Sequence, residues 1–132
     1  MALQLLVVTP ERKVVETEAD EVQLPGAEGY LGILPGHAAL ITLLKAGVLS
    51  YRRSGRSEAF AVSAGFAEIL EDRVSVLADS AEPGGDIDAG AAERERAQAE
   101  EEMKSAGIDT LAAIRARFDL AEARLSAARR PA

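Results

Sequence analysis

The sequence contains no cysteine and no tryptophan, and His37 is its only histidine. The lack of cysteine excludes disulfide bonds, thiol nucleophiles and cysteine metal ligands. One histidine cannot build a multi-histidine metal site, and catalysis by His37 would need a partner nucleophile or a second acid–base group. Since no nucleophile motif is recognisable either, the composition gives little support to an enzyme.

Positive charge is scarce, because 15 Lys and Arg face 22 Asp and Glu, for a net charge of −7. Such an acidic balance argues against non-specific binding of nucleic acid, which needs a basic face. No segment approaches the ~20 consecutive apolar residues of a membrane helix. The apolar start of the chain has no basic region before it and no small-residue cleavage site, so we expect it to form a first strand. Any membrane association is expected to go through protein partners.

Aromatic residues make up only 4% of the chain, so Ala, Val and Leu must pack its core. Residues 1–82 carry short apolar runs separated by turn residues, which is typical of an antiparallel β-sandwich or barrel. Ser54-Gly55 and Glu71-Asp72 are expected at hairpin tips. The predicted strands are 3–8, 14–16, 21–24, 30–33, 39–43, 47–52, 58–62, 66–70 and 74–78.

Pro83-Gly84-Gly85 marks a predicted linker at 83–85, after which the apolar period becomes helical. Residues 86–132 are predicted to form an antiparallel hairpin of two helices, at 86–106 and 110–129. Gly107 is the expected stop of the first helix, and Asp109 or Thr110 the N-cap of the second. The first helix has a weak apolar stripe that Arg96 interrupts. The second has a seam at spacings of three and four, formed by Leu111, Ile114, Phe118, Ala121, Leu125 and Ala128.

The densest pattern lies in residues 23–40, where Pro25-Gly26 and Pro35-Gly36 bracket a short apolar run. Proline presets the first central position of a turn and glycine supplies positive φ at the next. The chain must therefore reverse twice around one strand. A phosphate-binding loop is the less favoured interpretation, because no helix and no Lys-Ser/Thr pair follows the glycines.

Residues 24–38 read Leu-Pro-Gly-Ala-Glu-Gly-Tyr-Leu-Gly-Ile-Leu-Pro-Gly-His-Ala, a pattern that resembles the epsilon subunit of bacterial-type F-type ATP synthases, called delta in mitochondria. The resemblance implies an N-terminal β-sandwich and a C-terminal helical hairpin. It also implies a non-catalytic rotor subunit of the central stalk, which couples proton-driven rotation to ATP synthesis. Its partners would be the gamma subunit and the c-ring, on the cytoplasmic face of the bacterial cell membrane, with attachment to the membrane only through the complex. The hairpin would inhibit ATP hydrolysis by extending toward the alpha and beta subunits.

The resemblance suggests two sets of interface residues. Glu28, Tyr30 and His37 would lie on the side of the c-ring and gamma subunit; the position of Tyr30 is acidic in many relatives, so tyrosine there points to packing rather than ion pairing. Arg115, Arg117 and Arg124 would contact the acidic catalytic head. For His37 the alternative is a hydrogen bond within its own turn. For the arginines the alternative is an ordinary surface that balances the glutamates of the first helix.

Some relatives bind ATP in the folded hairpin through an Ile/Leu-Asp-x-x-Arg-Ala motif and arginines on the second helix. Here Asp88 is kept, but Ala91 stands where arginine is expected, and Leu120 precedes Arg124 in place of a second cation. Charge-assisted bonds to phosphate are the strong part of such a site. We therefore expect no cofactor, and weak or absent ATP binding at the remnant formed by Asp88 and Arg124.

Two functions of other classes stay open at this point. A β-sandwich adaptor with a coiled-coil tail, unrelated to rotary ATPases, would share the architecture but not the pattern of residues 24–38. A small hydrolase that uses His37 would need a pocket and a nucleophile beside it.

Overall fold

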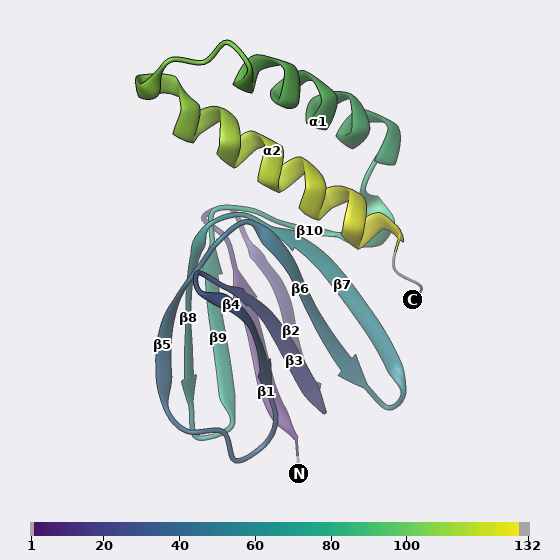
Figure 1. Ribbon diagram of the computed structural model, residues 1–132. Helices are drawn as coiled ribbons and strands as arrows, with labels where there is room; N and C mark the ends of the chain where they lie inside the picture. Colours follow the sequence, from purple (N-terminus) through teal and green to yellow (C-terminus); the bar gives the residue numbers. More distant parts are fainter. Residues whose placement is uncertain (1, 130–132) are drawn as a thin grey trace.

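The computed structural model describes residues 2–129, which form a β-sandwich capped at one end by two helices (Figure 1). The strands are β1 (Leu3–Val8), β2 (Lys13–Ala19), β3 (Glu21–Gly26), β4 (Gly29–Ile33), β5 (Leu40–Leu44), β6 (Gly47–Arg53), β7 (Arg56–Val62), β8 (Gly65–Leu70), β9 (Arg73–Ala78) and β10 (Ala81–Pro83). A 3₁₀ turn, η1 (Gly84–Asp86), leads to α1 (Ala89–Met103) and α2 (Ile108–Arg129). The predicted fold class is confirmed; the division into a sandwich at 1–82, a linker at 83–85 and a hairpin stays a prediction.

Nine strands follow one path of hydrogen bonding in the order β10-β7-β6-β3-β5-β8-β9-β1-β2, and β4 pairs with β3. All pairs are antiparallel except β1 with β9. The pairing of β3 with β5 is limited to Gly26 opposite Leu44. Arg53 at the end of β6 donates to the hydroxyl of Thr17 in β2 at 2.9 Å, so these two strands lie near each other although they are not paired.

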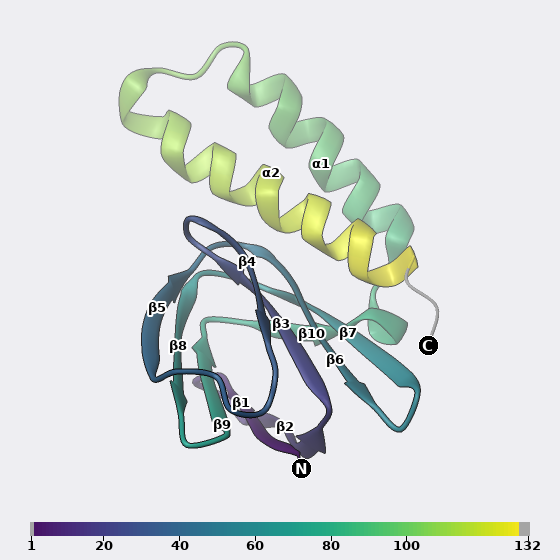
Figure 2. The same cartoon turned by 60° about the horizontal axis from the view of Figure 1, so that its bottom comes forward.

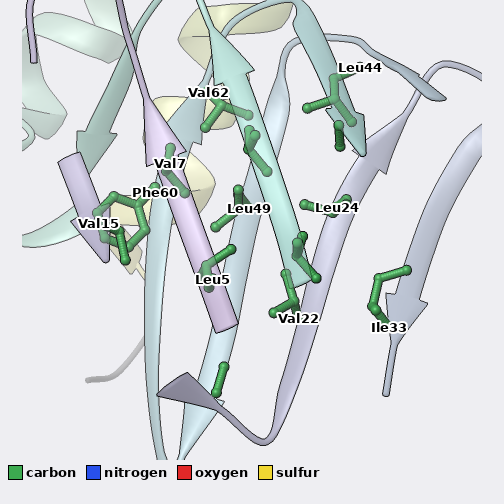
Figure 3. Packing of buried hydrophobic residues seen from close by; sticks show 14 of the residues in the cluster. Leu5, Val7, Val15, Val22, Leu24, Ile33, Leu44, Leu49, Phe60 and Val62 are labelled. Atoms are coloured by element: carbon green, nitrogen blue, oxygen red, sulfur yellow. The ribbon is translucent and has the colours of Figure 1, made fainter. Parts of the chain in front are cut away.

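Alternate residues of the strands point inward, as the period of two requires. In β1 the inward residues are Leu3, Leu5 and Val7, and all three are buried. They meet buried Val, Leu and Ile side chains from the strands around them (Figure 3). Phe60 and Tyr51 stack with ring centroids 6.2 Å apart and supply the aromatic part of this core. Aliphatic residues therefore do most of the packing, as the low aromatic content predicts.

Two tight turns occur where the sequence predicts hairpin tips. Ser54 and Gly55 both have positive φ between β6 and β7, and Glu71 and Asp72 have positive φ between β8 and β9. The strand that sequence analysis missed is β10. It pairs with β7 at the edge of the sheet, where a strand tolerates a proline such as Pro83.

The helices differ from their predicted bounds at the loop between them. Helix α2 begins at Ile108, not at 110, because the carbonyl of Gly107 accepts the N–H groups of Thr110 and Leu111 at 3.1 and 3.0 Å. Asp109 and Thr110 thus lie inside the helix, and the predicted N-cap at these residues is wrong. Helix α1 is shorter than predicted at both ends. Its N-cap is Asp88, whose side chain accepts the N–H of Ala91, and it ends at Met103 with Lys104 as its C-cap, so the predicted stop at Gly107 is wrong.

Helix α2 lies between α1 and the sandwich in both views of the molecule (Figure 2). Only the C-terminal half of the predicted seam is fully buried, by Ala121 and Leu125, whereas Leu111 is exposed. A second buried face carries Ala123 and Ala127 against the outer side of β6 and β7. In the N-terminal half Ile114 and Phe118 are half-buried and only Leu111 is exposed, so burial along the predicted seam decreases toward the hairpin tip, where α2 extends past the strands that it contacts.

Candidate functional site

Glu28 and Tyr30 lie at the turn between β3 and β4, at the helix end of the sandwich. Glu28 is exposed. Tyr30 is 56% exposed, yet its Oη accepts the backbone N–H of Val48 at 3.0 Å. Gly47 permits this approach, since a Cβ there would lie 2.9 Å from the Tyr30 Oη. Tyr30 therefore links β4 to β6 and presents one side of its ring to solvent.

His37 lies in the loop after β4, and its bonds are local. Its Nδ1 donates to the carbonyl of Ala38 at 2.7 Å, and its backbone N–H donates to Leu34 at 3.2 Å. The N–H of the preceding Gly36 donates to Asp72 in the β8–β9 turn at 2.7 Å. The hydrogen bond expected within the turn is thus present, and the loop is tied to the neighbouring hairpin.

The structure does not bring His37 together with Glu28 and Tyr30. Strand β4 separates them, so the β3–β4 turn lies beside the helices and the β4–β5 loop lies at the opposite end of the sandwich (Figure 1). The three residues therefore do not form one continuous surface, and their assignment to the side of the c-ring and gamma subunit stays a prediction. At the helix end, Tyr30 and Lys45 face Arg115 and Glu122 of α2 across a groove of about 310 Å³.

The three arginines of α2 also point to different partners. Arg115 donates to Asp119 one turn along the same helix at 3.2 Å. Arg117 reaches across to α1, where it contacts Glu95 at 2.8 Å and Glu102 at 3.1 Å. Arg124 contacts Glu82 of β10 at 2.9 Å. In this closed hairpin they do not form one free basic surface, because Arg117 and Arg124 each hold carboxylates of other elements.

The hydrogen bonds from Arg117 perturb both sides of its ion pair. They lower the pKa of Glu102 below its ordinary value, and Glu102 followed by Glu95 raises the pKa of Arg117. The interpretation of residues 110–130 as a surface that balances the glutamates of the first helix thus describes Arg117 in this conformation. Arg130 lies outside the described residues.

Asp88, which the resemblance assigns to the remnant of an ATP motif, is the N-cap of α1 in this structure. Its Oδ1 accepts the N–H of Ala91 at 3.0 Å, and this bond is the main reason why the pKa of Asp88 is lowered. Arg124, the other remnant, is occupied by Glu82. Ala91 and Leu120 are partly buried and offer no charge at the positions where cations would meet phosphate. Within residues 2–129 no group of three or more His, Asp or Glu side chains is placed to hold a metal ion.

An apolar face on β5, β8 and β9 was missed in the sequence. Leu43, Phe66 and Leu77 are direct neighbours across the three strands. Leu43 is 69% exposed and Phe66 44%. Ile41 and Leu70 extend the face toward the β4–β5 loop. The signal was available: Leu40-Ile41-Thr42-Leu43-Leu44 is apolar at both alternating sets of positions, which predicts that both faces of this strand are covered.

The apolar face continues into a hollow of about 400 Å³ at the helix end of the sheet. Pro10, Phe66 and Leu77 are among the residues that line it. Monomeric proteins rarely leave large contiguous apolar patches in water, so a patch of this kind marks an interaction surface. None of the described helices is long and apolar enough to cross a membrane.

Known proteins resemble this chain in sequence. Residues 2–84 match the family model described as the ATP synthase delta/epsilon chain, β-sandwich domain. An ATP synthase epsilon chain of Solibacter usitatus is 47% identical over 96% of this chain and 95% of its own. One from Moorella thermoacetica is 46% identical over 96% of both chains.

Two solved structures share the fold at low sequence identity. A chain in the Euglena gracilis mitochondrial ATP synthase structure of OSCP, F1 and c-ring has a TM-score of 0.84 at 20% identity, and the match covers 96% of this chain and 81% of that one. A chain in the Tetrahymena thermophila central stalk and c-ring structure has a TM-score of 0.63 at 18% identity, with 96% of both chains covered.

Proposed function

The chain belongs to the family of ATP synthase delta and epsilon chains, and on this premise we propose that it is a rotor subunit of the central stalk. In this role it couples proton-driven rotation to ATP synthesis and restrains ATP hydrolysis through its C-terminal helices. The observation that carries the proposal is the match to epsilon chains over both the sandwich and the hairpin, at 46 to 47% identity. The subunit itself performs no catalysis.

We place the gamma subunit on the apolar face of β5, β8 and β9. A partner that is always bound explains why apolar side chains face outward there, since obligate interfaces resemble a domain core. His37 borders this face, because its loop leads directly into β5. Glu28 and Tyr30, at the other end of β4, are assigned to a separate contact with the c-ring. The subunit is thereby held at the cytoplasmic face of the bacterial membrane through the complex alone.

The hairpin regulates hydrolysis by moving between the closed form described above and an extended form that reaches the alpha and beta subunits. The docking face of α2 is small, since it consists of Ala123 and Ala127 against Val48 and Ala61. Leu125 is the one large α2 side chain that is fully buried, which contributes about 1.5–3 kcal/mol. Ordering the hairpin costs on the order of 1 kcal/mol per residue in backbone entropy. A closed form so weakly held can be exchanged for contacts with the catalytic head.

Extension frees Arg117 and Arg124 from their carboxylates, so that together with Arg115 they can meet an acidic partner. ATP is not a strong ligand of the closed form. Asp88 is used as a helix cap and Arg124 is paired with Glu82, and no further cation stands at positions 91 and 120.

Reconstitution of the rotary complex tests these assignments. We expect Leu43→Ser together with Phe66→Ser to weaken incorporation of the subunit by at least tenfold, because the apolar face loses its largest contacts. Ile108→Ser is the matched control, since Ile108 is an exposed apolar residue at the hairpin tip, away from this face. Incorporation that is equal for all variants would contradict the placement of the gamma subunit.

The regulatory role is tested on the same complex with a chain that ends at residue 107. If α2 restrains hydrolysis, ATP hydrolysis rises when this shortened chain replaces the full one. An unchanged rate, with the shortened chain still bound, would leave the hairpin a structural role only. Failure of the full-length chain to join any rotary complex would instead favour the unrelated adaptor.

A further inference from the structure

The base of the hairpin meets the sandwich where the last turns of α2 lie against β10 and η1 (Figure 2). Two residues of the segment between the sheet and α1 make specific contacts there. Glu82 pairs with Arg124, and Gly84 lies against the backbone of Ala127. We call Glu82 and Gly84 the docking notch. The missing side chain of Gly84 leaves room for the backbone of α2, and Glu82 binds Arg124 of the same helix.

Glycine is required at position 84 because the backbone of α2 lies so close to it, not because of the backbone conformation of Gly84 itself. Its φ is not in the left-handed region, where only Gly29, Gly36 and Gly55 are found among the described glycines. A Cβ at position 84 would overlap the carbonyl oxygen of Ala127, and it would lie 3.0 Å from the carbonyl carbon and 3.3 Å from the Ala59 oxygen. These are backbone atoms, which cannot rotate away as the end of a flexible side chain can. An alanine at position 84 therefore conflicts most with the Ala127 carbonyl of α2, whereas its approach to the Ala59 oxygen of β7 is tight but needs only a small adjustment of the sandwich.

Glu82 adds an attractive contact at the same place. The Nε of Arg124 donates to one carboxylate oxygen at 2.9 Å and Nη2 donates to the other at 3.4 Å, so the guanidinium meets the carboxylate with two donors. The two side chains are 26% and 37% exposed, so part of this contact is withdrawn from water. Paired donors on a planar carboxylate fix orientation as well as distance. The positive charge of Arg124 is thereby balanced by Glu82 without any added anion.

We propose that the docking notch sets the balance between closed and open hairpin, and that it holds the closed form without nucleotide. Gly84 admits the backbone of α2, and Glu82 then binds Arg124. This inference deepens the regulation proposed above and rests on it for its biological meaning. The closed-to-open ratio is a property of the isolated chain. The docking notch can therefore prove unimportant while the role in the rotary complex stands, and the role in the complex can fail while the docking notch still controls the hairpin.

The test follows the hairpin in the full-length isolated chain. The chain has no native cysteine, so Ser57→Cys on β7 and Ser105→Cys at the hairpin loop, both exposed, accept a pair of dyes for single-molecule energy transfer. We expect Gly84→Ala to lower the ratio of closed to open molecules by at least tenfold without added nucleotide. Gly85→Ala is the matched control, since a Cβ at position 85 meets nothing within 4 Å. Identical distributions for the two variants would overturn the steric part of the proposal.

A second pair of variants tests the ionic part and does not depend on the fold of the glycine variants. Glu82→Gln is expected to lower the closed-to-open ratio about threefold at low salt, with a smaller difference in high salt, where charges are screened. Glu101→Gln is its control, because Glu101 pairs with Lys104 at the end of α1, away from the sandwich. A response of Glu101→Gln equal to that of Glu82→Gln, or no response of either, would overturn the proposed role of the Glu82–Arg124 pair. Intact sandwich structure in every variant is verified by cooperative thermal melting.

Discussion

Arg117 of α2 donates to both carboxylate oxygens of Glu102 on α1, at 3.1 and 3.2 Å. The same guanidinium donates to Glu95, about two turns earlier on α1, at 2.8 Å. One cation thus holds two carboxylates of the facing helix. Because the N-terminal half of α2 has few buried apolar side chains, this cluster is the main specific contact between the helices there.

Replacement of Arg117 by methionine should therefore loosen the distal half of the hairpin. The pair is exposed to solvent, so the effect is modest, and we expect opening to increase about threefold. Hydrogen exchange of residues 95–117 measures it. Arg115→Met is the control, because Arg115 pairs only with Asp119 on its own helix among the described side chains. Equal exchange in the two variants would show that the interhelical cluster does not hold the hairpin.

Acid should loosen the hairpin before it unfolds the sandwich. Asp88, Glu93 and Glu102 have pKa values lowered by the Ala91 N–H, Arg96 and Arg117 respectively. Since each folded pKa lies below the unfolded one, the stabilisation is complete above the ordinary values of 3.8 and 4.5 and is lost as the pH falls through the folded values. Far-ultraviolet circular dichroism should show helix loss below about pH 4.5. A gain of helix on acidification would show that these ionised carboxylates destabilise the hairpin, contrary to the prediction.

Tyr30→Phe should cost about 1 kcal/mol of stability in the isolated chain, because it removes the hydroxyl that accepts the N–H of Val48. Val48 is almost fully buried, so solvent cannot easily replace that acceptor. Denaturant unfolding measures the loss. The phenylalanine variant keeps the exposed ring and should still assemble, whereas Tyr30→Ala should impair both stability and the contact with the c-ring that we propose. If the complex with Tyr30→Ala couples proton-driven rotation to ATP synthesis normally, Tyr30 does not contribute to that contact.

A chain ending at residue 88 should fold without the helices. The large buried cluster of the sandwich is built from strand residues alone, and β10 with Glu82 is retained. Removal of the hairpin uncovers a small apolar patch, which includes Val48 and Ala61 with Ala59 and Ile87 beside them. Calorimetry should show one cooperative transition with β-type circular dichroism. A non-cooperative transition would mean that sandwich and hairpin share one folding unit.

Calorimetric titration of the isolated chain with ATP should reveal at most weak binding. Ala91 and Leu120 carry no charge, and Arg124 is paired with Glu82. The double substitution Ala91→Arg and Leu120→Arg restores the missing cations and should increase affinity. Ala97→Arg is a control for added charge, because Ala97 is an exposed position of α1. Tight binding by the unmodified chain would show that other groups replace these cations.

The sequence alone determined the fold class and most of the strands. The bounds of β1 coincide with the predicted 3–8, because alternation of buried and exposed residues is a property of the chain itself. The pattern of residues 24–38 likewise led to the family. Helix ends were less well predicted, since Gly107 can end one helix or provide the first acceptor of the next. Strand β10 was missed because Pro83 disfavours a strand unless it lies at an edge, and edges are set by topology.

Only the tertiary structure decided which candidate residues act together. Position along the chain placed Tyr30 near His37, but β4 carries them to opposite ends of the sandwich. Arg124 was visible in the sequence, whereas its partner Glu82 lies 42 residues away, and no local pattern relates them. The apolar positions of β5 could be found by alternation, but alternation does not say which face the core covers. These relations arise from how the strands are ordered in the sheet and where α2 lies on it, and such long-range geometry has no periodic signature in the sequence.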